Sequence, residues 1–212
     1  MMLESPHKRD LPAGTHALGM GLFLATLTML FGAGLLAYLF IRLRAASDPA
    51  GLPMHSITVP WLLFLSTALM LAASACIHRA LTAARIGRLH VTRSLLAVAA
   101  GLAVLFVAVQ IPALWALWRE HHAASQGFGV ETETQIVPKQ GIHAFYGAVV
   151  FLIATHAAHV FGGLIPLGVV LVKARQGCYT QAAHVPLRML VWYWHFLDIV
   201  WVTLLLVFLV IG

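Results

Sequence analysis

The hydrophobic residues of this chain fall into long uninterrupted runs, whereas soluble proteins show alternating or one-sided patterns. Each run has at least the roughly 20 residues that a helix needs to cross about 30 Å of hydrocarbon. The pattern therefore predicts five membrane-spanning helices, at about residues 15–41, 57–77, 94–117, 142–172 and 188–211. The longest polar break, residues 118–141, is interpreted as a surface loop with some helix.

The composition indicates a single membrane domain. Of the 212 residues, 61% are hydrophobic and only 9% are charged, and the polar segments leave no room for a soluble catalytic module. We expect an all-α polytopic membrane protein, a bundle of five transmembrane helices in one domain over residues 1–212. The first apolar run is too long for a removable signal peptide, so we expect it to stay in the protein.

The basic residues predict the orientation of the chain. If the N-terminus is cytoplasmic, nine of the 13 basic residues lie on the inner side and four on the outer side, which agrees with the positive-inside rule. We therefore expect an N-in, C-out topology. The same asymmetry accounts for the net charge of +6 without a nucleic-acid partner, because basic and aromatic residues do not interleave on any soluble face.

Two pairs of polar residues lie within the apolar runs. His156 and His159 share one face of the fourth predicted helix, and His195 and Asp198 repeat this three-residue spacing on the fifth. Such groups are costly in lipid and need partners. Facing pairs could ligate a metal, relay protons, or form a hydrogen-bonded lock between helices. We favour the lock, because a relay needs continuation and no other acidic residue lies at membrane depth.

Other positions refine this picture. His16 and His78 are interpreted as interfacial residues, and no cofactor motif is present, so we expect no catalytic residue, cofactor or metal in this chain. Ala154, Ala158 and Gly162 recur every four residues on the fourth predicted helix. Small residues let helices approach closely, so the pattern predicts a face that contacts another helix.

The last predicted helix resembles the C-terminal helix of subunit III of the haem-copper respiratory oxidases. The signature of that family is matched by Tyr193, Trp194, His195, Phe196, Asp198 and Trp201. Upstream, His156, His159 and the pair Gly162-Gly163 look like the family's two-histidine motif and glycine pair. The resemblance covers nearly the whole chain.

The chain also departs from the family pattern at two buried acids. Leu27 stands where family members carry a glutamate, and Ala113 stands where an acidic residue is expected after Gln110. A carboxylate-controlled process therefore cannot be carried over. With five predicted spans, the chain is similar to the short bacterial form that lacks two helices.

The resemblance implies a noncatalytic subunit in a bacterial inner (cytoplasmic) membrane, within the aerobic respiratory chain. Its implied partners are the catalytic subunit I, which would hold the haem and copper, subunit II and other oxidase subunits. Its implied roles are to stabilise the catalytic subunit, to bind phospholipid and to keep proton uptake efficient. Candidate lipid contacts are Arg79, Gly32, Gly34 and Ala37. The alternative is an accessory protein of nitric oxide reductase related to subunit III.

Overall fold

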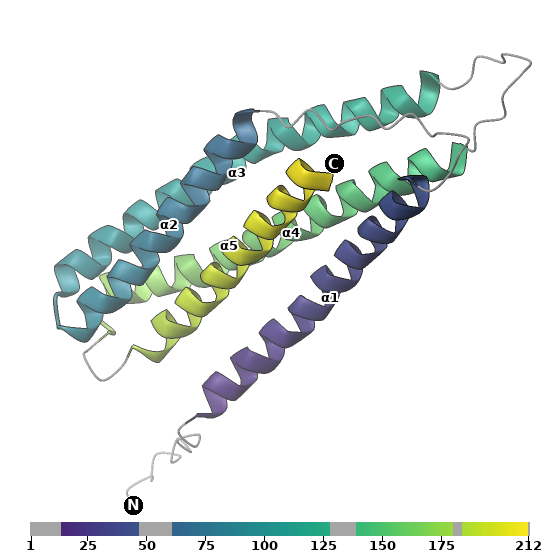
Figure 1. Ribbon diagram of the computed structural model, residues 1–212. Coiled ribbons are helices and arrows are strands. Elements are labelled where there is room, and N and C mark those ends of the chain that lie inside the picture. Colours follow the sequence, from purple (N-terminus) through teal and green to yellow (C-terminus); the bar gives the residue numbers. More distant parts are fainter. Residues whose placement is uncertain (1–13, 47–60, 128–138, 180–183, 212) are drawn as a thin grey trace, which may run out of the picture.

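The computed structural model describes residues 14–46, 61–127, 139–179 and 184–211, and these ranges contain five α-helices and no strand. Figure 1 shows the helices running lengthwise beside one another. Their bounds are α1 Thr15–Ala46, α2 Trp61–Arg85, α3 Leu89–Gly127, α4 Lys139–Arg175 and α5 Val185–Ile211.

All five helices are long and apolar enough to cross a membrane, which confirms the predicted all-α polytopic fold. Most helices extend past the predicted spans. The second span was predicted to end at residue 77, but α2 continues to Arg85, and α3 begins at Leu89 rather than at residue 94. An apolar run measures only the crossing of the hydrocarbon, whereas backbone hydrogen bonding continues through basic residues whose charged ends reach the interface.

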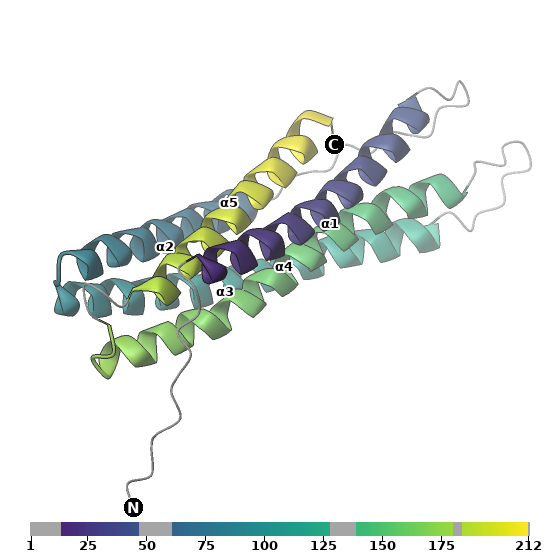
Figure 2. The same ribbon diagram turned by 90° about the horizontal axis from the view of Figure 1, so that it is seen from below.

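Helix α5 has three neighbouring helices, as α4 does. It contacts α1, α2 and α4, while α4 contacts α1, α3 and α5, and α2 packs along α3. The described parts of α1 and α2 make no contact with each other. The second view shows the same bundle from below (Figure 2). Three neighbouring helices can therefore supply hydrogen-bond partners to the polar residues of α5.

Two glycine turns lie at the same end of the bundle (Figures 1 and 2). Gly87, after α2, and Gly177, after α4, have φ of 77° and 78°, values that favour glycine. In each turn the following amide donates to a carbonyl in the last helical turn, a common helix stop: Arg88 N to Ala83 O at 2.9 Å and Cys178 N to Lys173 O at 3.0 Å.

Arg93 connects the beginning of α3 with the end of α4. Its Nε donates to the carbonyl of Ala174 at 2.8 Å, so the beginning of α3 is held against the end of α4. Because that carbonyl belongs to the last turn of α4, a cationic donor there also interacts favourably with the helix dipole.

The core is apolar and is centred on α5. Its fully or nearly fully buried residues on that helix include Leu187, Leu190, Trp194, Leu197, Trp201, Leu204 and Phe208. Large apolar side chains of α1 and α4, such as Leu22, Met29 and Ile165, are exposed on the outside of the chain. This distribution is expected for a membrane protein, because lipid solvates such side chains.

The predicted small-residue face of α4 is wrong for the contacts within this chain. Ala154, Ala158 and Gly162 are all exposed, and the close approach to α5 is made at Gly163. A Cβ atom added at Gly162 would reach only the hydroxyl of Tyr193, at 3.9 Å. A Cβ atom added at Gly163 would lie 2.8 Å from Cε1 of Tyr193 on α5. Since successive residues on a helix are rotated by about 100°, an error of one position turns the predicted face away from its neighbour.

Candidate functional site

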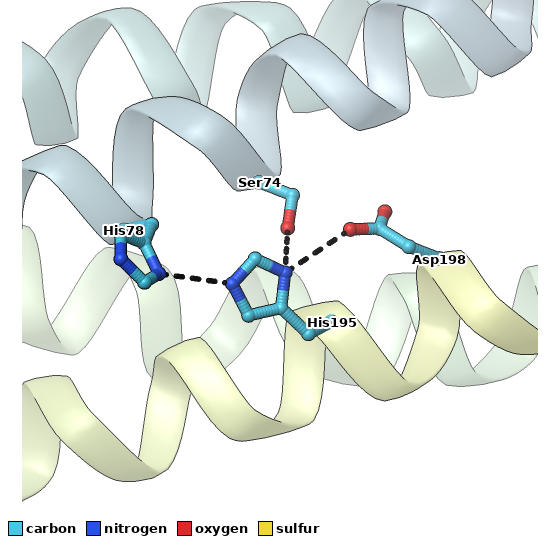
Figure 3. Close-up of polar contacts among 4 residues, drawn as sticks. All are labelled: Ser74, His78, His195 and Asp198. Carbon is cyan, nitrogen blue, oxygen red and sulfur yellow. Dashed lines mark hydrogen bonds and ion pairs between the residues drawn. The ribbon is translucent and has the colours of Figure 1, made fainter.

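A polar cluster connects α5 with α2. The Nδ1 atom of His195 lies 3.0 Å from Oγ of Ser74 and 3.5 Å from Oδ2 of Asp198. On the other side of the ring, Nε2 of His195 lies 3.1 Å from Nδ1 of His78. Figure 3 shows the His195 ring between the other three side chains. We call Ser74, His78, His195 and Asp198 the α2–α5 cluster.

Helical spacing explains why these four residues meet. His195 and Asp198 are three residues apart on α5, and Ser74 and His78 are four residues apart on α2, so each pair shares one helix face. The two faces oppose each other because α2 packs against α5. The partners of His195 are 121 and 117 positions away in the sequence.

The α2–α5 cluster runs from the interior to the outside of the chain. The side chain of Asp198 is 10% exposed, that of His195 is 43% exposed, and His78 is also exposed. Within the described part of the chain, Oδ1 of Asp198 is buried and has no hydrogen-bond partner. The cluster therefore has one incompletely paired acid inside and two histidines open to the surroundings.

The other histidine pair has a different environment. His156 is 1% exposed, and its ring stacks on Trp201 with centroids 4.9 Å apart. The ring of Phe31 on α1 lies edge-on at 6.3 Å from His156 and 5.5 Å from His159. Among the described residues, neither ring nitrogen of His156 has a hydrogen-bond partner. Apolar and aromatic groups therefore enclose this imidazole.

His159 bonds locally, and the direct link from α5 to α4 comes from a different residue. Nδ1 of His159 lies 2.7 Å from the carbonyl of Thr155 in the preceding turn. The hydroxyl of Tyr193 donates to the carbonyl of His159 at 2.7 Å, and Nε1 of Trp201 donates to Oγ1 of Thr67 on α2 at 2.8 Å. The family-signature residues Tyr193 and Trp201 thus tie α5 to both neighbours.

The four residues proposed as one polar lock are therefore divided between two places. His195 and Asp198 face α2, whereas His156 and His159 face α1 and Trp201. No hydrogen bond between the two pairs is present in the described residues. The sequence pattern did not single out Ser74, and it indicated His78 only as an interfacial residue, although the four-residue spacing of the two at the end of an apolar run was a usable signal.

The geometry offers little for a metal ion. Within residues 14–46, 61–127, 139–179 and 184–211, no three histidine, cysteine, aspartate or glutamate side chains are grouped so that they could hold one. In the α2–α5 cluster, His195 uses one ring nitrogen toward His78 and the other toward Ser74 and Asp198, so neither is left for a metal.

The candidate lipid contacts are not brought together. Arg79 is exposed on α2, whereas Gly32, Gly34 and Ala37 belong to α1, and those two helices make no contact in the described residues. A Cβ atom added at Gly34 would lie 2.8 Å from a methyl carbon of Leu152 on α4, so this position is occupied by a helix contact. Gly32 has open space around it, and Ala37 is exposed.

Two positions connected with the missing acidic residues lie in the interior. They are Leu27, which stands where family members carry a glutamate, and Gln110, after which an acidic residue is expected. Leu27 is 6% exposed and belongs to the hydrophobic core. Gln110 is 4% exposed, and within the described residues its Oε1 has no hydrogen-bond partner.

Comparison with known proteins gives consistent matches. Residues 131–212 match the family described as cytochrome c oxidase subunit III. The chain is 26% identical over 209 residues to cytochrome bo(3) ubiquinol oxidase subunit 3 of Pseudomonas aeruginosa, covering 99% of this chain and 90% of the relative. It is 27% identical over 211 residues to cytochrome c oxidase subunit 3 of Bacillus subtilis, covering 98% and 92%.

A shorter match has a higher identity. Over 61 residues, 28% of this chain and 22% of the relative, the chain is 43% identical to cytochrome c oxidase subunit 3 of Chondrus crispus.

Proposed function

Because the chain belongs to the subunit III family of the haem-copper respiratory oxidases, we propose that it is the noncatalytic subunit III of a terminal oxidase complex. The complex would reduce oxygen and couple this reaction to proton pumping in aerobic respiratory electron transport. The observation that carries the proposal is the similarity to oxidase subunits along 98–99% of the chain.

Within this complex the chain has no catalytic centre of its own. The haem and copper belong to the partner catalytic subunit I, and this chain also assembles with subunit II and other oxidase subunits. Its role is to stabilise the catalytic subunit and to keep proton uptake efficient. Bound phospholipid contributes to that role through the inner basic residues and open positions such as Gly32 and Ala37.

The proposed placement is a bacterial inner membrane, with the N-terminus in the cytoplasm and the C-terminus outside. Bacterial oxidase subunits among the relatives support this location. The end of the bundle that carries the Gly87 and Gly177 turns then faces the cytoplasm, and its arginines meet anionic headgroups.

The structural role of the polar residues is also part of the proposal. The α2–α5 cluster locks α5 to α2, while Tyr193 locks α5 to α4 through the carbonyl of His159. The alternative, an accessory protein of nitric oxide reductase, is not favoured, because the relatives described above are named as subunits of ubiquinol and cytochrome c oxidases.

Purification from the native membrane tests this proposal. The tagged chain, extracted in mild detergent, is expected to bring with it a subunit that contains two haems and copper, together with oxygen consumption. Recovery with a subunit that contains haem and nonhaem iron would instead support the nitric oxide reductase alternative. Recovery without any haem-bearing subunit would contradict both.

A further inference from the structure

The contact between His78 and His195 limits how many protons the two rings can carry. Nδ1 of His78 lies 3.1 Å from Nε2 of His195, and the ring centroids are 5.3 Å apart (Figure 3). Two ring nitrogens at this distance share one proton, because one nitrogen must donate and the other must accept. A protonated imidazole carries a proton on both nitrogens. Whichever ring is the donor, at least one imidazole is therefore neutral while the contact is formed.

The charge beside the rings sets the same limit. Among the described residues, Asp198 is the one acid that contacts them, with Oδ2 at 3.5 Å from Nδ1 of His195. Ser74 lies 3.0 Å from the same nitrogen and carries no charge. A single carboxylate can balance one imidazolium but not two, and an unbalanced charge within a membrane-spanning helix is costly. A second proton therefore has neither a place in the hydrogen bond nor a counter-charge.

Two arginines add positive charge along the same helix faces. Arg188 lies seven positions before His195 on α5, and Arg85 lies seven positions after His78 on α2. Seven residues make nearly two helical turns, so each arginine is on the side of its helix that carries the histidine, about 10 Å along the axis. Their charges oppose the charging of both rings.

The remaining helices do not contribute charge to the contact. On α4, His156 and His159 lie against Phe31 of α1. In the described part of the chain, no hydrogen bond or ion pair joins an ionisable side chain of α1, α3 or α4 to His78 or His195. The contact therefore depends on the protons of the α2–α5 cluster itself.

We propose that the contact between His78 and His195 is an acid-sensitive lock between α2 and α5, closed while at least one of the two imidazoles is neutral and opened when both are protonated. His78 is exposed and the side chain of His195 is 43% exposed, so both rings are accessible from outside the chain. The lock goes beyond the proposed function and concerns this chain alone.

Acidification should open the lock, because the open state holds one proton more than the closed state. Each extra proton changes the opening equilibrium by up to about tenfold per pH unit. Histidine changes its charge between about pH 5 and pH 8, so the lock is expected to be closed near pH 8 and increasingly open toward pH 5.

Opening is expected at one end of the contact between α2 and α5. Away from the cluster, the side-chain hydrogen bond between these helices in the described residues runs from Nε1 of Trp201 to Oγ1 of Thr67, at 2.8 Å. Neither group titrates, so this bond should persist in acid. Thr67 lies eleven positions before His78, about 16 Å along α2. Acid should therefore separate the helices near the cluster and leave the region of Trp201 closed.

Distances between spin labels on the purified full chain in mild detergent test the lock. One label pair, at Thr82 and Trp192, lies at the cluster end, and the matched control pair, at Phe64 and Leu206, lies at the Trp201 end. All four positions are exposed. Between pH 8 and pH 5, the first pair is expected to move apart while the control pair keeps its distance.

The native cysteines are first replaced by Cys76→Ala and Cys178→Ala, so that only the chosen positions carry labels. Unchanged distances between Thr82 and Trp192 from pH 8 to pH 5 would overturn the lock. An equal movement of both label pairs would also overturn it, because that result indicates a general loosening of the helices in acid.

A second measurement tests whether the paired imidazoles are responsible. The amide of His78→Gln can donate or accept, so it can bond to Nε2 of His195 in either tautomer, and it does not titrate. The Thr82 and Trp192 labels should then keep the same distance at both pH values.

The control His90→Gln removes a histidine that is exposed on α3, and it should open in acid as the wild type does. Equal opening of His78→Gln and His90→Gln would show that the contact between the rings is not the lock. The label distances in the chain with an unaltered cluster decide the question even if His78→Gln is unstable.

Discussion

The two polar pairs of this chain, His156 with His159 and His195 with Asp198, have the same spacing and opposite environments. His195 belongs to a hydrogen-bonded cluster that opens to the outside, whereas His156 is enclosed by Phe31 and Trp201 and lacks a hydrogen-bond partner among the described residues. An aromatic contact contributes about 0.5–1.5 kcal/mol, while an unpaired buried polar group costs about 1–3 kcal/mol. The i, i+3 spacing therefore brings two residues to one face of a helix but does not decide whether the surroundings of that face are polar.

The largest expected effect is for substitution of Trp201, which stacks on His156 and also bonds α5 to α2. Trp201→Ala removes the stacking partner of His156, the edge contact with Phe106 and the indole donor to Thr67. We expect a loss of about 3–5 kcal/mol in the free energy of unfolding, as for other large-to-small changes at buried aromatic residues. Thermal unfolding in mild detergent measures the loss.

Trp192→Ala is the matched control for Trp201→Ala. Trp192 is 40% exposed and contacts the Arg188 guanidinium at 5.7 Å, so its removal should cost much less. Equal losses for the two variants would show that α5 is not held through the Trp201 contacts.

The next expected effect concerns the α2–α5 cluster. Asp198→Leu removes the carboxylate beside Nδ1 of His195 and leaves Ser74 as the remaining partner of that nitrogen. The loss of a hydrogen-bonded partner costs up to about 1–3 kcal/mol in a protein interior and about 0.6 kcal/mol for an average interhelical bond in a membrane. We expect fewer assembled complexes, with normal turnover in those that assemble. Subunit stoichiometry and oxygen consumption per haem measure the two effects separately.

Thr203→Leu is a suitable control for Asp198→Leu, because Thr203 is exposed on α5 and, among the residues that the structure describes, bonds to the local carbonyl of Ile199 alone. Full assembly of Asp198→Leu with loss of proton pumping would favour the relay interpretation over the lock.

The packing of α4 on α5 also depends on the close approach of the α4 backbone to Tyr193 at Gly163. Gly163→Ala places a Cβ atom 2.8 Å from the ring of Tyr193, so the ring or the helix must move, and we expect a loss of about 1–2 kcal/mol. Ala158→Leu changes an exposed position on the same helix and should alter the stability of this chain by less than about 0.5 kcal/mol. A larger loss of stability for Ala158→Leu would show that the predicted small-residue face does contact another helix.

The smallest change is expected at His156 itself. His156→Phe replaces a ring whose two buried nitrogens have no hydrogen-bond partner in the described part of the chain with an apolar ring of similar shape. The stability should stay the same or rise by up to about 1 kcal/mol, because removing an unsatisfied group offsets any loss of stacking. His195→Phe, the same substitution in the hydrogen-bonded cluster, should be destabilising. A marked loss for His156→Phe would indicate a buried partner for that imidazole.

The sequence by itself determined the class of fold, because a bilayer leaves a long apolar segment with no backbone hydrogen-bond partner other than its own helix. The five spans, the shared face of each polar pair and the signature on the last helix could all be predicted. The ends of the helices could not, since hydropathy measures the hydrocarbon crossing and not the hydrogen-bonded helix.

Only the tertiary structure decided which neighbour each face meets. Ser74 and His78 lie more than 100 positions from His195 in the sequence, and nothing local to α5 indicates that it faces α2 there. The close approach to the Tyr193 ring is made at Gly163, where an added Cβ atom would lie 2.8 Å away, whereas one at Gly162 would lie 3.9 Å from the Tyr193 hydroxyl. An apolar helix face is equally well solvated by lipid and by another helix, so hydropathy does not indicate which side of a helix is buried. The rotation of each helix is set by the packing of all five.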